Sequence, residues 1–105
     1  MTAISMTDLP ADVALYLERR ERALGDVRKL LASILDFKIE PADIDPDASL
    51  FGTGLGLDSL DAVEILVGLD IDLGIKLEGD DPIRMGLRSV NAVVDAVMRA
   101  RGELS

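Results

Sequence analysis

The sequence contains no cysteine, no histidine and no tryptophan among its 105 residues. Without cysteine and histidine there are no disulfides, no thiol nucleophiles and no catalytic pairs of serine or cysteine with histidine. The usual ligand sets for zinc, haem and iron–sulfur clusters are missing as well. We therefore expect no metal site and no catalytic residues, and we predict that the protein is not an enzyme.

Aromatic residues are scarce, since Tyr16, Phe37 and Phe51 are the only ones. The core must therefore consist of aliphatic side chains, which is typical of helical proteins, and a chain of this length has room for one small core. The segment Met1–Val13 lacks the basic flank and apolar run of a signal peptide, and no stretch approaches the roughly 18 apolar residues of a membrane span. These absences predict a soluble, cytoplasmic protein.

The net charge is −9, and the acidic residues are concentrated in one part of the chain. Residues 40–81 contain more than half of the 20 acidic side chains and one base, Lys76. A field of this sign repels nucleic acids and anionic lipids and attracts basic protein surfaces. The sequence therefore predicts a basic protein surface as the partner, and neither nucleic acid nor a membrane. We expect the protein to be a monomer.

Apolar periodicity predicts a first helix that ends at Leu35. We expect Thr7 or Asp8 to be its N-cap, with Pro10 in the first turn, where the missing N–H has no cost. Gly25 divides this helix into two halves, and the sequence leaves open whether the helix breaks there.

Three later segments also carry helical signals. Ser59–Leu73 follows Asp58, a good N-cap, and ends before Gly74, a typical C-terminal stop. A short helix is expected at Pro82–Gly86, and a last helix runs from Ser89 to about Gly102. The connection at residues 37–58 contains prolines and glycines but also regularly spaced apolar residues. We therefore expect a long loop that is anchored to the core, and such loops are often functional.

The helix at residues 59–73 carries two apolar faces. The broader face, which we expect to point to the core, comprises Ala62, Ile65, Leu66, Leu69 and Leu73. The second face comprises Leu60, Val63, Val67 and Ile71. Either the bundle buries both faces, or the second is an exposed strip for a partner protein. The acids Asp61 and Glu64 interrupt this strip and favour the exposed alternative.

Residues 55–60 read Leu-Gly-Leu-Asp-Ser-Leu, at the point where a glycine-rich loop gives way to an acidic helix. This segment resembles the acyl carrier protein family, whose signature around the modified serine is Leu-Gly-x-Asp-Ser-Leu. The resemblance covers roughly residues 24–101. It implies an all-α, acyl-carrier-like bundle of three main helices plus one short helix. Residues 23–102 would form the carrier domain, and residues 1–22 would be an N-terminal helical extension.

The resemblance also implies a function for Ser59. This serine would carry a 4′-phosphopantetheine arm, added by a phosphopantetheinyl transferase, whose terminal thiol holds acyl groups as thioesters. Acyl synthases, transferases or synthetases with basic docking patches would be the partners, in fatty-acid, polyketide or related lipid biosynthesis. They would bind a surface made of Asp58, Leu60, Asp61, Val63, Glu64 and Val67.

Two alternatives remain open at this point. A peptidyl or aminoacyl carrier has the same arm, but such carriers tend to be less acidic around the serine. A non-covalent adaptor, a small acidic helical module that docks a basic partner, would need no arm. The end of the acidic helix, residues 69–73, also differs from that of common fatty-acid carriers, which points to a specialised carrier at least as much as to a housekeeping one.

Overall fold

The computed structural model describes residues 10–52, 54–77 and 87–103. These residues form three α-helices, α1 (Ala11–Ile34), α2 (Ser59–Leu73) and α3 (Val90–Ala100), and one short 3-10 helix, η2 (Pro41–Asp43). Pairing between extended segments in the described ranges is limited to isolated bridges. The predicted all-α fold with three main helices is therefore confirmed. The short helix predicted at Pro82–Gly86 lies outside the described residues.

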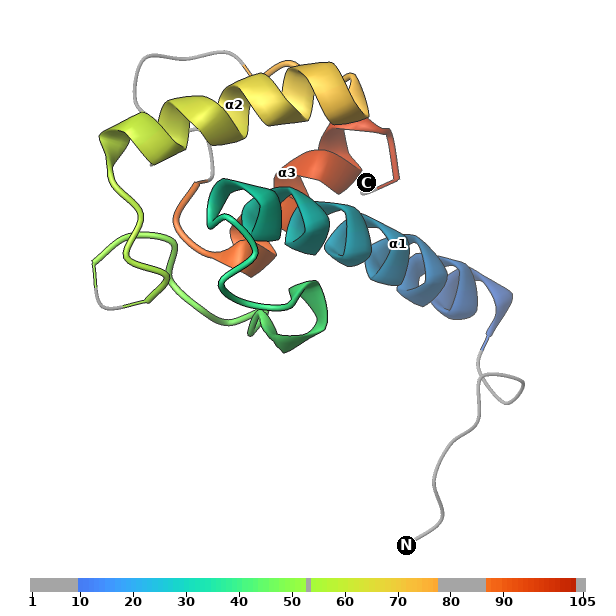
Figure 1. Cartoon of the computed structure of the whole chain (residues 1–105). Helices are drawn as coiled ribbons and strands as arrows, with labels where there is room; N and C mark the ends of the chain where they lie inside the picture. Colours follow the sequence, from blue (N-terminus) through green and yellow to red (C-terminus); the bar gives the residue numbers. More distant parts are fainter. Residues whose placement is uncertain (1–9, 53, 78–86, 104–105) are drawn as a thin grey trace, which may run out of the picture.

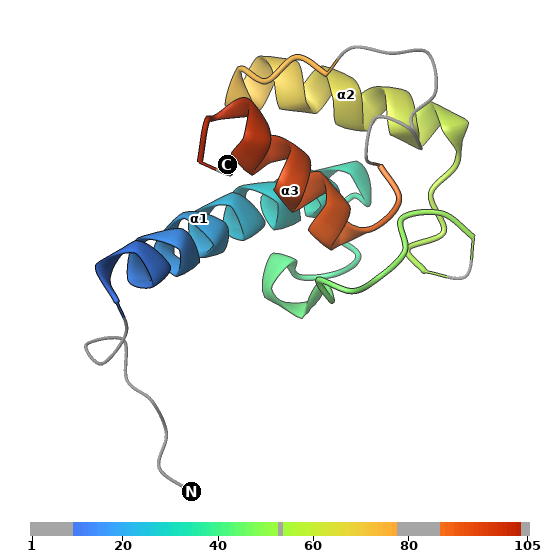
Figure 2. The ribbon, with the colours of Figure 1, turned by 180° about the vertical axis from the view of Figure 1, so that it is seen from behind.

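The helix α1 is the central element of the fold. It packs against α2, α3 and η2, and the first turns of α1 project beyond the other helices (Figures 1 and 2). In both views α2 lies on one side of α1 and runs in the opposite direction, with the N-terminus of α2 at one end of the bundle. Ser59 is the first residue of α2. Within the described residues, no helix is both long enough and apolar enough to cross a membrane.

The beginning of α1 differs from the prediction. Pro10 is the N-cap and not part of the first turn, because its ψ of 147° is extended rather than helical. Its carbonyl nevertheless accepts the first helical hydrogen bond, from the Ala14 N–H at 3.0 Å. The question left open at Gly25 is also answered, since α1 continues through this residue without a break. The predicted division of the chain at residue 22 stays a prediction.

Polar side chains tie α1 to α3. Arg20 donates from Nη1 to Asp95 Oδ1 at 2.6 Å and from Nη2 to Asn91 Oδ1 at 3.0 Å. The hydrogen bond to Asp95 raises the pKa of Arg20 above its ordinary value, against the opposing effect of partial burial. Arg101 at the end of α3 donates back to Asp26 of α1 at 2.9 Å. These contacts fix the two helices side by side.

Replacing Arg20 by alanine is expected to lower the free energy of unfolding by about 1 kcal/mol, because it removes two hydrogen bonds that are only partly exposed to water. Arg22→Ala is the matched control, since Arg22 lies exposed on the same helix. Urea unfolding followed by circular dichroism measures both variants. Equal stability of the two variants would show that the Arg20 contacts do not hold α1 against α3.

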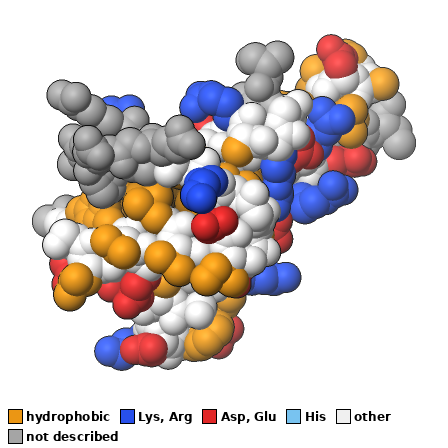
Figure 3. Space-filling model, turned by 90° about the horizontal axis from the view of Figure 1, so that it is seen from above, with side chains coloured by type: hydrophobic (Ala, Val, Ile, Leu, Met, Phe, Trp, Pro, Cys, Tyr) orange, Lys and Arg blue, Asp and Glu red, His pale blue; other side chains and the backbone are white. Residues whose placement is uncertain are grey.

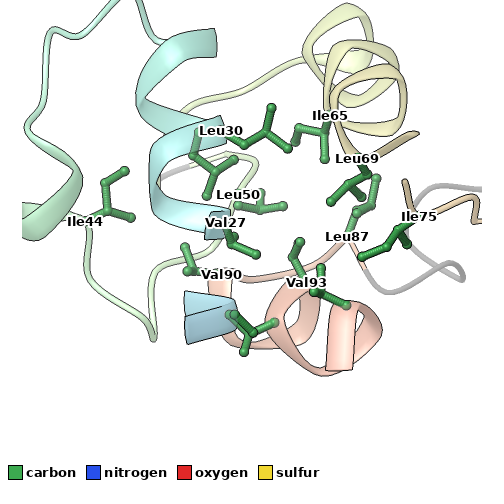
Figure 4. Packing of buried hydrophobic residues seen from close by; sticks show 14 of the residues in the cluster. Val27, Leu30, Ile44, Leu50, Ile65, Leu69, Ile75, Leu87, Val90 and Val93 are labelled. Carbon is green, nitrogen blue, oxygen red and sulfur yellow. The ribbon is translucent and has the colours of Figure 1, made fainter. Parts of the chain in front are cut away.

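The core is aliphatic, as the composition predicts. The largest buried side chains come from all three helices and from the loops between them, and they pack together in one cluster (Figure 4). From the long loop, Ile44, Leu50 and Leu57 are buried in this cluster. The prediction that apolar side chains anchor the loop is therefore confirmed. The loop leads to the first residue of α2, so the core also determines where that residue lies.

Candidate functional site

The N-terminus of α2 is closed by a capping box. The Asp58 carboxylate accepts a hydrogen bond from the Asp61 N–H at 2.9 Å, and Asp61 Oδ2 accepts one from the Asp58 N–H at 3.0 Å. Reciprocal bonds of this kind fix the first helical turn. Ser59 is the first residue of α2 and is exposed. Its hydroxyl is therefore presented to solvent from a fixed turn at the end of the bundle.

Backbone hydrogen bonds hold the loop that leads to Ser59. The Leu55 N–H donates to the Ser49 carbonyl at 2.8 Å, and the Leu57 N–H donates to the Leu50 carbonyl at 2.9 Å. The Leu50 N–H in turn donates to the Arg88 carbonyl at 3.0 Å, which joins the loop to the segment before α3. The approach to Ser59 is therefore anchored only a few residues before α2 begins.

Gly54 is required because two backbone segments of the loop approach each other closely at this position. A Cβ atom at this position would overlap the backbone carbonyl group of Ser49, the same carbonyl that binds the Leu55 N–H. A backbone group cannot move aside as the end of a side chain can. Only glycine therefore fits this close approach.

The core-facing side of α2 agrees with the prediction. Ala62, Ile65 and Leu69 are buried, and Leu66 and Leu73 pack against the core while partly exposed. Near the middle of α2, a Cβ atom on Gly68 would overlap the Leu30 side chain of α1. The missing side chain lets the two helices approach closely, and this contact keeps one face of α2 turned inwards.

The second apolar face of α2 is exposed. The fractional exposures are 73% for Leu60, 54% for Val63, 49% for Val67 and 75% for Ile71. Figure 3 looks onto the side of the molecule that carries α2, and hydrophobic side chains gather there beside acidic ones. Of the two alternatives left open by the sequence, the structure supports the exposed strip. We call Leu60, Val63, Val67 and Ile71 the α2 strip.

All charged residues of the α2 segment are acidic. Asp58, Glu64, Asp70 and Asp72 are exposed, and Asp61 is partly exposed because it takes part in the capping box. No base occurs between Asp58 and Leu73. The structure thus brings Ser59, the acids and the α2 strip together on a single helix, and the negative field there attracts basic surfaces.

One exposed residue of the α2 strip, Ile71, is absent from the predicted docking residues. Ile71 falls on the second apolar face in the sequence, but the predicted docking set ended at Val67. The sequence places it in line with the other three side chains, but its high exposure is visible only in the structure. The spacing of residues 60, 63, 67 and 71 was the signal in the sequence that could have found it.

The fold and the site define a small helical bundle that presents a serine at a helix N-terminus. Residues 25–97 match the protein family described as "Phosphopantetheine attachment site". The chain therefore belongs to this phosphopantetheine-binding family of acyl carrier proteins.

One curated relative is "Acyl carrier protein 2, mitochondrial" from Arabidopsis thaliana, which is 30% identical over 70 residues, or 66% of this chain and 53% of the relative. The chain thus spans about half the length of that relative. No solved structure shows a significant match to the chain.

The cofactor of the family is 4′-phosphopantetheine, and the N-terminus of α2 fits such a group. A phosphodiester requires an exposed hydroxyl for its attachment, and Ser59 provides one. The first N–H groups of a helix lack partners within the helix and carry partial positive charge, which favours a phosphate nearby. Proteins of this family are carriers, not catalysts.

Proposed function

We propose that the chain is an acyl carrier in which Ser59 holds the 4′-phosphopantetheine arm. The observation that carries this proposal is the exposure of Ser59 as the first residue of a capped helix, at the end of an anchored loop. When bound, the arm supplies a terminal thiol that forms thioesters with acyl groups. The chain itself supplies the attachment oxygen, its fixed position and the docking surface, and it acts as a carrier and not as an enzyme.

Attachment needs a second protein. The Ser59 oxygen forms a bond to the phosphate next to the pantetheine part of coenzyme A, the phosphoanhydride bond breaks, and 3′,5′-adenosine bisphosphate leaves. The hydroxyl proton must go to a base, and the sequence contains no histidine to accept it. A phosphopantetheinyl transferase therefore supplies the base and binds coenzyme A.

The docking surface that we propose comprises Asp58, Leu60, Asp61, Val63, Glu64 and Val67. Exposed acids at the start of α2 speed the encounter with basic patches on the transferase and on acyl synthases, transferases or synthetases. The exposed apolar side chains then set much of the lifetime of each complex. A shuttle needs weak complexes that exchange quickly, and a narrow strip on one helix suits this requirement.

We further propose a role in fatty-acid or related lipid biosynthesis, supported by the acyl carrier protein to which the chain is similar. The acidic α2 favours an acyl carrier over a peptidyl carrier. A polyketide pathway, a monomeric state and a cytoplasmic location stay predictions from the sequence.

Loading with a transferase tests the proposal. The protein incubated with coenzyme A and a phosphopantetheinyl transferase should gain the mass of one phosphopantetheine. If several unrelated transferases leave the chain unmodified, the carrier proposal is contradicted and the non-covalent adaptor becomes the better account.

Charge reversal at Glu64 should slow loading. Glu64→Lys places a cation where we propose that basic enzyme surfaces dock, and we expect kcat/KM of the transferase to fall by about tenfold, mostly at low salt. Glu21→Lys is the matched control, because Glu21 is exposed on α1 away from the α2 strip. The same loss in both variants would show that net charge matters and that the position on α2 does not.

A further inference from the structure

The α2 strip continues well past the residues that surround Ser59. Leu60, Val63, Val67 and Ile71 follow one another at intervals of three or four residues, so they lie in line along one side of the helix. At 1.5 Å per residue, the strip is about 16 Å long. Ile71, at its far end, is as exposed as Leu60. Nothing in the core explains an isoleucine at this position, because its side chain points away from the cluster.

The charges along α2 are arranged in two groups. Asp58, Asp61 and Glu64 lie at the Ser59 end, and Asp70 lies at the other end, next to Ile71 in the sequence. Asp72 instead lines a groove between α2 and α1 together with Asp26 and Lys29. The five residues between the groups, Ile65–Leu69, carry no charge. The gap from Glu64 to Asp70 is about 9 Å along the helix axis. The strip is thus continuous, whereas the negative charge is divided between its two ends.

We propose that Ile71 is a specificity-determining docking residue, and that the acyl enzyme it selects has an apolar track about 16 Å long with basic side chains at both ends. This inference rests on the proposed function of Ser59. It extends the docking surface by one helical turn beyond the residues nearest the arm. An enzyme that binds only the first two turns of α2 does not contact Ile71, so its affinity does not depend on that residue. An enzyme whose surface spans the whole of α2 contacts Ile71 and does depend on it.

The charge pattern argues against a second copy of the chain as the occupant. Two α2 surfaces placed face to face would bring their acidic groups together, and α2 carries no base to neutralise them. Like charges held close at an interface oppose association. A basic and apolar partner removes the exposed hydrophobic area of the strip from water and also neutralises the acids.

The test uses the loaded protein as substrate for a purified acyl-condensing synthase. In the Ile71→Ser variant we expect the KM for the loaded carrier to rise by about tenfold, because a large apolar side chain no longer enters the interface. The kcat should stay unchanged, since the arm and Ser59 are intact. Ile71→Leu should restore the wild-type KM, and Ile71→Lys should raise KM further by repelling the basic side chains of the partner.

Leu15→Ser is the matched control, since Leu15 is an exposed apolar residue on α1. Equal KM values for Ile71→Ser and Leu15→Ser would overturn the inference about Ile71. A wild-type dimer that Ile71→Ser no longer forms, measured by analytical ultracentrifugation, would place a second copy on the strip and also overturn it. Loading is measured first by intact mass. A chain that cannot be loaded contradicts the proposed function, whereas a loaded chain with an unchanged KM contradicts only the role of Ile71.

Discussion

Replacing Ser59 by alanine should abolish the addition of phosphopantetheine completely. The change removes one oxygen atom from an exposed position at the start of α2, so the fold should not change. The capping box is made by Asp58 and Asp61 and does not use the Ser59 side chain. The loss would therefore report chemistry and not stability. Intact-mass spectrometry after incubation with a transferase and coenzyme A gives the result.

Ser33→Ala is the control for this experiment. Ser33 is also exposed and lies on α1, outside the motif that resembles the signature of the family. We expect this variant to be loaded as fully as the wild type. If Ser59→Ala still gains the mass of phosphopantetheine, another hydroxyl carries the arm and the assignment of Ser59 is wrong.

Gly54→Ala should destabilise the protein by about 3 kcal/mol, because the new Cβ atom would overlap the carbonyl group of Ser49. The loop would have to move and lose the hydrogen bond from the Leu55 N–H to that carbonyl. For a domain of this size, the loss corresponds to a decrease in Tm of about 15 °C. We also expect slower loading, since the same loop determines where Ser59 lies. Thermal unfolding followed by circular dichroism measures the effect.

The matched control is Gly25→Ala, which should have the opposite sign. Gly25 lies inside α1, and no atom is close to the position of its missing Cβ. Alanine has the higher helix propensity, so this variant should be more stable by about 1 kcal/mol. A Gly54→Ala variant with the stability of the wild type would show that the loop can move at no cost, and that glycine is not required there.

Much of the fold follows from local signals in the sequence. Asp58 and Gly74 bound α2 as predicted, because an N-cap side chain and a left-handed residue act on their own neighbours. Ser89 likewise caps α3 through a hydrogen bond from the Ala92 N–H. The continuity of α1 through Gly25 could not be predicted. The helix is held on both sides of Gly25 by contacts between residues far apart in the sequence, those of Arg20 with Asp95 and of Asp26 with Arg101.

The features of the site likewise fall into those that local sequence signals predict and those that depend on long-range packing. The motif around Ser59 is local, so its place at the start of a helix could be predicted from the sequence. The exposure of the second apolar face was favoured only by the acids Asp61 and Glu64, because periodicity shows that a helix has two apolar faces and not which of them the bundle covers. That choice is made by long-range packing, in particular where Gly68 meets Leu30. The requirement for glycine at position 54 could not be predicted either, because it arises from the close approach of Gly54 to the Ser49 backbone.

Mass spectrometry of the protein isolated from cells that express it naturally tests the central claim most directly. After proteolysis, the peptide that contains Ser59 should carry one phosphopantetheine, and fragmentation should place it on that serine. A fraction of the molecules should also carry an acyl group on the thiol, which would identify the cargo. Ser59 found unmodified throughout, or the arm found on another residue, would contradict the account.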